Sequence, residues 1–202
     1  MSNDSVEKAR RRFLVHSTSV VGGAGILAAA VPFVDSMSIS ARARAVGAPI
    51  EVDIGKLEPG RRLAVEWRGQ PVWVIHRTAQ MMDSLETLRP KLADPESGAS
   101  AQPTYAGNPV RARASHPRIL VFIPICTHLG CIPSYRPEVR PADLGEDWLG
   151  GFFCPCHGSR YDLAARVYRS QPAPRNMAVP PYAYLSDTRL LIGEDDVRGR
   201  SG

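Results

Sequence analysis

The chain has 202 residues, and its 25 Lys and Arg against 20 Asp and Glu give a formal net charge of +5. Residues 1–44 hold six of the basic and three of the acidic side chains, whereas residues 45–202 hold 19 and 17. Most of the excess charge therefore belongs to the N-terminal segment. The rest of the chain has no basic stripe with interleaved aromatic residues, so nucleic-acid binding has no support in the sequence.

The N-terminal segment combines a run of arginines with an apolar stretch. Arg10-Arg11-Arg12-Phe13-Leu14 resembles a twin-arginine translocation signal. The 22 residues that follow the arginines contain one ionisable side chain, His16, and would cover about 33 Å as a helix, enough for a bilayer core of about 30 Å. We therefore predict a cytoplasmic segment over residues 1–12 and a transmembrane anchor over residues 13–35.

The basic residues before the apolar stretch predict its orientation. Lys8 and the three arginines favour a cytoplasmic N-terminus, so the rest of the chain would lie on the periplasmic side of a bacterial inner membrane. Serine, threonine and glycine dilute the apolar stretch, and Ala41-Arg42-Ala43 is a candidate cleavage site, so a cleaved signal peptide is the alternative to a retained anchor.

After the anchor, small residues without proline over residues 36–48 predict a flexible hinge, and residues 49–202 are short enough for one domain. Alternating apolar residues and turn signals predict a mostly antiparallel β head, in which Pro90 ends one short helix. The expected strands cover residues 50–54, 63–67, 72–75, 119–123, 152–153, 182–185 and 188–192, and the expected helix covers residues 81–88.

All four cysteines lie in two short boxes separated by 22 residues, Cys126-Thr127-His128-Leu129-Gly130-Cys131 and Cys154-Pro155-Cys156-His157-Gly158-Ser159. The strands at 119–123 and 152–153 deliver these boxes as paired loops. Two Cys and two His from such loops can hold one metal centre, and the two further Cys can pair with each other. This pattern fits an iron-sulfur centre in which two His replace two Cys on one iron.

Two other interpretations use the same residues. A structural zinc site commonly draws on C-x2–4-C and H-x3–5-H spacings, whereas each box here supplies one Cys and one His with an additional Cys. Four cysteines can also form two plain disulfides in three connectivities, which leaves the adjacent histidines unexplained.

The two boxes resemble those of Rieske proteins of the quinol-oxidising kind found in cytochrome bc complexes. The resemblance implies one [2Fe-2S] Rieske cluster, with Cys126 and Cys154 on one iron and His128 and His157 on the other. It also implies a disulfide between the two remaining cysteines, Cys131 and Cys156. The implied fold is a Rieske-type antiparallel β head with an inserted cluster-binding subdomain, about residues 118–174, preceded by one N-terminal transmembrane helix.

Residues after the second box extend the resemblance. Hydroxyls at the positions of Ser159 and Tyr161 donate hydrogen bonds to sulfur in quinol-oxidising relatives, which favours the reduced cluster and raises its potential. The sequence Gln171-Pro172-Ala173-Pro174 resembles the rigid Pro loop that covers the cluster. The family's usual first residue there is Gly, so Gln171 is a departure that puts the local turn geometry in question.

The resemblance also implies partners and a mechanism. Leu129 and Gly130 at the tip of the first box correspond to residues that dock against cytochrome b. The head would take an electron from quinol there, with His157 accepting the quinol hydrogen bond and proton, and would then pass the electron to a c-type cytochrome in a dimeric membrane complex. The alternative is an exported Rieske electron-transfer subunit of another oxidase, similar to the small subunit of arsenite oxidase.

Overall fold

The computed structural model describes residues 3–37 and 47–196, with the side chains of residues 3–5 left out. The chain divides into two compact units, residues 1–45 and 46–202. The predicted hinge over residues 36–48 and the candidate cleavage site at 41–43 fall largely or wholly on residues 38–46, outside the described residues. Both therefore stay predictions.

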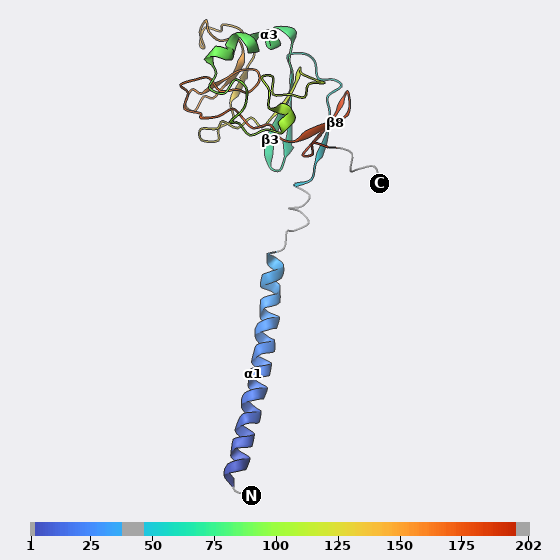
Figure 1. Cartoon of the computed structure of the whole chain (residues 1–202), viewed down its shortest axis with the longest axis vertical. Helices are drawn as coiled ribbons and strands as arrows, with labels where there is room; N and C mark the ends of the chain where they lie inside the picture. Colours follow the sequence, from blue (N-terminus) through green and yellow to red (C-terminus); the bar gives the residue numbers. More distant parts are fainter. Residues whose placement is uncertain (1–2, 38–46, 197–202) are drawn as a thin grey trace. The chain divides into compact units, whose positions relative to one another are not determined.

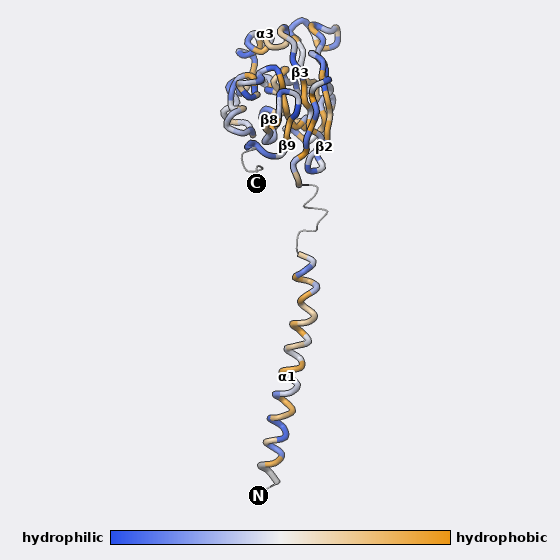
Figure 2. Tube along the Cα trace, turned by 90° about the vertical axis from the view of Figure 1, so that its right-hand side faces the viewer, coloured by the Kyte–Doolittle hydropathy of each residue, from blue (hydrophilic) through white to orange (hydrophobic). Residues whose placement is uncertain are grey.

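The N-terminal unit is one helix, α1 (Asn3–Ser36). Within the described residues, one helix is long and apolar enough to cross a membrane, and it covers Val6–Ser36. Apolar side chains are exposed along its length. Figure 2 shows hydrophobic residues recurring along the helix. The Thr18 hydroxyl donates a 2.6 Å hydrogen bond to the Leu14 carbonyl, which satisfies that polar group inside an apolar stretch. The helix begins ten residues before the predicted anchor, because the charged residues ahead of it also favour helix.

The head contains three antiparallel sheets of three strands each within the described residues. Figure 1 labels one strand from each of two of these sheets, β3 and β8. These two sheets form the base of the head. The first is ordered β1–β9–β8 and joins the two ends of the head, and the second is the meander β2–β3–β4. The base strands are β1 (Ile50–Asp53), β2 (Arg62–Trp67), β3 (Gln70–His76), β4 (Ile119–Phe122), β8 (Tyr182–Ser186) and β9 (Arg189–Ile192). Their positions confirm the strand predictions.

The third sheet carries the second box and supports the first. It consists of β5 (Ser134–Arg136), β6 (Gly151–Phe153) and β7 (Arg160–Tyr161), in that order. The first box lies between β4 and β5, and the second box lies between β6 and β7. The sequence predicted β6 but missed β5 and β7, because strands of two or three residues are too short to show an alternating pattern.

Aromatic packing joins this third sheet to the base. The Phe122 and Phe152 rings lie 4.8 Å apart, and Trp73 packs at 5.9 Å from Phe122 and 6.1 Å from Phe152. All three side chains are buried in the main core, and the four residues of β4 are buried on both faces. Because β4 and β6 end beside the same aromatic cluster, the two box loops start from one rigid platform.

The helix α3 (Ala79–Leu88) agrees with the prediction. The Thr78 side chain caps it by accepting a hydrogen bond from the Met81 N–H. Leu85 and Leu88 are buried, and the α-helix ends before Pro90, which lies in a short 3-10 turn, Arg89–Lys91.

The stretch between α3 and β4 is irregular but is fastened to the box-carrying half of the head. Leu92 forms a β-bridge with Tyr168, and the Ala93 N–H donates to the Val167 carbonyl. Asn176, which follows the Pro loop in the chain, donates from its side-chain amide to the Asp94 carbonyl oxygen. Residues 90–117 are therefore a structural part of the head.

Gly151 in β6 lies very close to the backbone of β7. A Cβ at this position would lie 2.0 Å from the Tyr161 carbonyl oxygen of β7, closer than any real contact. We predict that Gly151→Ala lowers the free energy of unfolding by about 3 kcal/mol or more, because β6 and β7 must move apart to make room for the Cβ. Thermal unfolding of the purified chain measures this effect.

Gly98→Ala is the matched control, since a Cβ at Gly98 meets nothing within 4 Å. It should leave the unfolding midpoint nearly unchanged. Equal midpoints for the two variants would contradict the close approach between β6 and β7.

Candidate metal centre

The two box loops have the same backbone design. In the first loop the Cys126 N–H donates to the Cys131 carbonyl at 2.8 Å, and the Gly130 N–H donates back to the Cys126 carbonyl at 3.0 Å. In the second loop the Cys154 N–H donates to the Ser159 carbonyl at 2.8 Å, and the Gly158 N–H donates to the Cys154 carbonyl at 2.9 Å. Each loop therefore closes as a tight turn that begins at a cysteine.

A glycine in the left-handed region makes each turn possible. Gly130 has φ +83° and Gly158 has φ +78°, a conformation that costs other L-residues about 1–2 kcal/mol. A Cβ at either glycine would meet nothing within 4 Å, so the requirement is conformational rather than steric. The glycines in the two boxes are thus explained by turn geometry.

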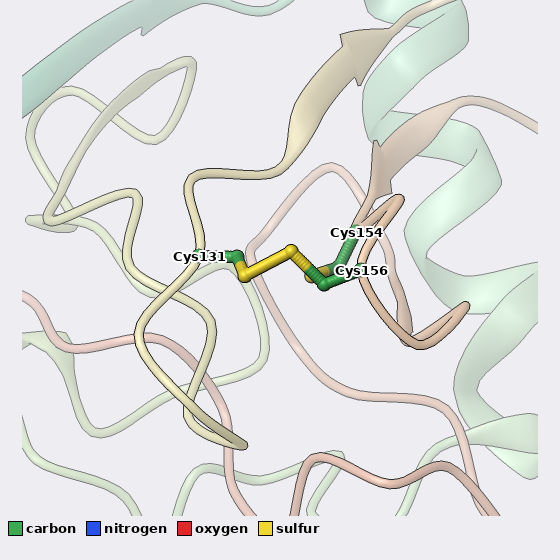
Figure 3. A group of neighbouring side chains, drawn as sticks. All are labelled: Cys131, Cys154 and Cys156. Atoms are coloured by element: carbon green, nitrogen blue, oxygen red, sulfur yellow. A yellow bond between two sulfur atoms is a disulfide. The ribbon is translucent and has the colours of Figure 1, made fainter.

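A disulfide between Cys131 and Cys156 joins the two loops (Figure 3). It confirms the pairing that the family resemblance implied, and it leaves Cys126 and Cys154 as free thiols. The Cys154 sulfur lies within 4.8 Å of both disulfide sulfurs. This group of three cysteines is not itself a metal site, because disulfide sulfurs carry no thiolate charge with which to bind a cation.

The four predicted ligands form two contrasting pairs. Cys126 and Cys154 are each only 2% exposed and interact with each other, whereas His157 is exposed and His128 is half-buried. The two imidazole rings meet edge to face with centroids 4.7 Å apart. Two buried thiols behind two accessible imidazoles fit the donor set of an iron-sulfur cluster with a Cys-ligated inner iron and a His-ligated outer iron.

Hydrogen-bond donors surround the Cys126 sulfur. The Tyr161 hydroxyl donates to the Cys126 sulfur at 3.3 Å and accepts a hydrogen bond from the Thr127 N–H at 3.1 Å. Burial by itself would raise the pKa of the Cys126 thiol, but hydrogen bonds from Tyr161, the His128 N–H and Ser159 outweigh burial and lower it. The pocket therefore favours negative charge on this sulfur.

The partner thiol behaves differently. Burial and the neighbouring Cys126 sulfur raise the pKa of Cys154, because two adjacent thiolates repel each other in a low-dielectric site. Burial likewise raises the pKa of the Tyr161 hydroxyl, so Tyr161 stays protonated and remains a donor. A cation between the two sulfurs is what would allow both to be thiolates.

The Pro loop packs against the second box. The Ala173 N–H donates to the Ser159 hydroxyl oxygen at 3.1 Å, so the hydroxyl proton is free to point toward sulfur. Ala173 is buried, whereas Pro172 and Pro174 on either side of it in the chain are exposed. The predicted Pro loop thus lies next to the predicted tuning residue.

Gln171 has a specific contact. Its side-chain oxygen accepts a 3.1 Å hydrogen bond from the Arg160 N–H, between Ser159 and Tyr161 in the chain. The preceding residue, Ser170, has the left-handed conformation, with φ +56°. The departure from glycine is therefore accommodated by a left-handed Ser170 and a side-chain hydrogen bond back to β7.

Several residues around the site were not identified from the sequence. Thr127 ties the first box to the end of the Pro loop by donating from its hydroxyl to the Arg175 carbonyl at 2.7 Å. The Asn176 side-chain oxygen accepts a 2.8 Å hydrogen bond from the Val167 N–H, which joins the segment after the Pro loop to the segment after β7. A buried Asp162–Arg166 ion pair follows β7 directly. Only the short distance of these residues from the boxes in the sequence could have indicated them.

The tip of the first box is apolar and accessible. Leu129 is 69% exposed and Ile132 is 54% exposed, and Gly130 between them is also exposed. Exposed apolar side chains grouped beside an accessible histidine pair are typical of an interaction surface.

Two family models match parts of the chain. A family model described as the Rieske [2Fe-2S] domain matches residues 94–183, and one described as the Ubiquitinol-cytochrome C reductase Fe-S subunit TAT signal matches residues 1–40. A solved structure of a hyperthermophilic respiratory Complex III contains a chain with 26% identity and a TM-score of 0.46, covering 89% of this chain and 98% of that chain.

Curated relatives match nearly the whole chain. The ubiquinol-cytochrome c reductase iron-sulfur subunit of Allochromatium vinosum is 60% identical over 195 residues, which is 96% of this chain and 93% of the relative. The subunit of the same name from Blastochloris viridis is 42% identical over 194 residues, which is 95% of this chain and 97% of the relative. The chain therefore belongs to the family of ubiquinol-cytochrome c reductase iron-sulfur subunits, and its head is a Rieske [2Fe-2S] domain.

Proposed function

We propose that Cys126 and Cys154 ligate one iron of the Rieske cluster and that His128 and His157 ligate the other. The single observation that carries this assignment is the arrangement of two buried free thiols behind two accessible imidazoles, with the other two cysteines joined in a disulfide. When bound, the cluster supplies one-electron redox chemistry at a potential raised by its two neutral ligands.

The function that this site supports is quinol oxidation in the cytochrome bc complex. The exposed imidazole of His157 is the group that a quinol hydroxyl can reach, so it would accept the quinol hydrogen bond and then hold the proton on the ring nitrogen that does not ligate iron. The buried thiols and Tyr161 lie behind it and exclude water from the sulfur side. Cytochrome b would provide the quinol pocket at this edge.

Leu129 and Gly130 would provide the docking contact with cytochrome b. The apolar tip contains no charge that must be desolvated, and its left-handed glycine holds Leu129 outward on a turn of fixed geometry. The same exposed edge would then meet a c-type cytochrome, which receives the electron. Two copies of this assembly would form the dimeric complex.

The helix α1 would act as a retained single-pass anchor. The positive charges of Lys8 and Arg10–Arg12 favour a cytoplasmic N-terminus, and the head would then lie on the periplasmic side of a bacterial inner membrane. The match of residues 1–40 to a twin-arginine signal supports export of a folded head. An oxidising destination is also where the Cys131–Cys156 disulfide is stable.

The alternative, a Rieske subunit of an arsenite-oxidase-like enzyme, is not favoured. The relatives reported above are named as ubiquinol-cytochrome c reductase subunits and align over more than nine-tenths of this chain. A structural zinc site is likewise disfavoured, because the Rieske [2Fe-2S] domain model matches residues 94–183, which contain both boxes.

Low-temperature EPR of membranes containing this chain tests the proposed function. After mild reduction with ascorbate, we expect a rhombic signal from a His-ligated [2Fe-2S] cluster that changes when a quinol-site inhibitor is added. A signal that requires dithionite would indicate a low-potential Rieske carrier instead. Absence of any iron signal, with zinc found by metal analysis, would overturn the redox function.

The Tyr161 hydroxyl generates a second prediction. Tyr161→Phe removes the donor to the Cys126 sulfur and should lower the reduction potential by on the order of 60 mV, or about 1.4 kcal/mol for one electron, without loss of the cluster. Ser159→Ala should act in the same direction. Redox titration followed by EPR measures both shifts.

Tyr135→Phe is the matched control, because the Tyr135 hydroxyl donates to the Gly60 carbonyl and not to sulfur. Its potential should equal that of the wild type. If Tyr161→Phe and Ser159→Ala also keep the wild-type potential, these hydroxyls do not tune the cluster.

A third prediction concerns docking. Leu129→Arg places a charge on the apolar tip and should reduce quinol–cytochrome c turnover of the complex at least about tenfold while the reduction potential stays unchanged. Leu185→Arg, at an exposed position near the end of β8, is the control and should keep full turnover. Equal turnover of the two variants would exclude the tip as the docking contact.

A further inference from the structure

Three fully buried arginines surround the turn that follows β7. Arg77, Arg111 and Arg166 are each 0% exposed, and they come from the end of β3, the 90–117 stretch and the turn itself. Asp162 is the only fully buried carboxylate in the described part of the chain. Three positive charges against one negative charge leave a net charge of +2 in the interior.

The single carboxylate is fully used by one arginine and the backbone. Asp162 pairs with Arg166 at 2.7 Å and accepts hydrogen bonds from the Ala164 and Arg166 N–H groups at 2.9 and 2.8 Å. Arg166 also donates to the carbonyls of Leu85 and Pro95. This ion pair is neutral as a unit and explains how the turn is held.

The other two guanidinium groups contact only neutral acceptors. Arg77 donates to the carbonyls of Leu163 and Pro117. Arg111 donates to the carbonyls of Ala164 and Ala165 at 3.4 and 3.2 Å and to the Gln102 side-chain oxygen at 3.2 Å. The Nε atoms of both arginines find no hydrogen-bond acceptor among the described residues. Burying such charges is costly, and neutral side chains could have filled the space.

Burial lowers the pKa values of Arg77 and Arg111 to about 10, so both remain protonated near neutral pH. The Asp162 charge and, for Arg111, the half-buried Asp94 attract them from nearby without touching them. Asp94 is engaged instead with the Gly98 and Ala99 N–H groups and the Ser100 hydroxyl. Two cations thus stay charged without a direct counter-ion.

Their position connects them to the metal centre. The turn they contact, residues 162–166, begins at the residue after Tyr161, whose hydroxyl donates to the Cys126 sulfur. A buried charge is poorly screened by salt, so its field extends through the protein to groups about 10 Å away. Positive potential favours the more negative, reduced form of an iron-sulfur cluster.

We propose that the uncompensated buried charges of Arg77 and Arg111 raise the reduction potential of the cluster. This inference rests on the proposed function, because it requires the cluster to be bound by the two boxes. It also assigns a role to the 90–117 stretch, which delivers Arg111 to the back of the cluster-binding half. The two arginines act through the electric field and are positioning residues for the turn as well.

The test separates charge from contact. Arg111→Gln removes the charge, and Arg111→Lys keeps it while losing the planar fork of donors. We expect Arg111→Gln to shift the ratio of reduced to oxidised cluster about tenfold at fixed ambient potential, which is 59 mV for one electron, toward the oxidised form. Arg111→Lys should stay near the wild type. Arg77→Gln and Arg77→Lys form a second pair with the same expectation.

Arg113→Gln is the charge-matched control. Arg113 belongs to the same stretch and stacks on Tyr105 at 3.6 Å, but it is half-exposed, and its guanidinium donates to the Tyr182 carbonyl in β8. Its removal changes the net charge equally and should leave the potential unchanged. The shift in Arg111→Gln should also persist at high ionic strength, because the charge is buried.

A variant that keeps every arginine covers the case in which the substitutions at Arg77 and Arg111 prevent folding. Gln102→Glu places a negative charge against Arg111, whereas Gln102→Leu loses the same Gln102 donor to the Ser97 carbonyl without adding charge. Only Gln102→Glu should lower the potential. The proposal would be overturned if the two Arg→Gln variants and Gln102→Glu all kept the wild-type potential. It would also be overturned if the two Arg→Lys variants lowered the potential as much as the Arg→Gln variants do.

Failure of this inference is distinguishable from failure of the proposed function. If the wild type shows no [2Fe-2S] signal, the proposed function fails first. If the wild type shows the signal and a high potential but the charge variants match it, only the role of the arginines is lost.

Discussion

The disulfide between Cys131 and Cys156 is the constraint on which the site depends, because the two box loops start from β4 and β6, which belong to different sheets. The two cysteines are 25 residues apart in the sequence, and closing a loop of that length stabilises the fold by about 3–4 kcal/mol through the unfolded state. It also holds the loops over Cys154, whose sulfur lies within 4.8 Å of both disulfide sulfurs. The aromatic contact of Phe122 with Phe152 aligns the strands below, so covalent and packing constraints act on the same two loops.

Most elements of the head were predictable from local sequence patterns. Apolar residues alternate in β1 and β2, short turns mark the hairpins β2–β3 and β8–β9, and β4 is a continuous apolar run. Helix α3 shows a helical period that ends before Pro90. The pairing of β1 with β9 was not predictable, because it joins residues about 140 positions apart, and local sequence patterns contain no information on such contacts. The short strands β5 and β7 were missed because two or three residues show no period.

The sequence predicted the chemically distinctive residues of the candidate site, namely the ligands, the disulfide cysteines, the tuning hydroxyls and the Pro loop, but not the polar contacts that hold its loops in place. Cysteine and histidine are rare enough that their spacing indicates chemistry, whereas the residues that hold the loops are ordinary polar side chains. Thr127, Gln171 and Asn176 act through hydrogen bonds that depend on where the backbone passes. Gln171 shows why: a glycine's conformational freedom is replaced here by a left-handed Ser170 and one side-chain contact, a combination visible only in three dimensions.

Two kinds of positive charge favour negative charge on the sulfur side of the site. They are the partial charges of hydrogen-bond donors and the full charges of the buried arginines. Backbone N–H groups and the Tyr161 and Ser159 hydroxyls lower the pKa of Cys126 at close range, and they are fixed by the turns that the two glycines permit. The buried arginines lie behind β7 and are fixed by carbonyls of the turn after Tyr161. Negative charge is therefore favoured on the sulfur side, while the accessible histidines leave one edge open to exchange protons. This asymmetry between a buried electropositive side and an open imidazole edge separates the stabilisation of charge from the access of substrate.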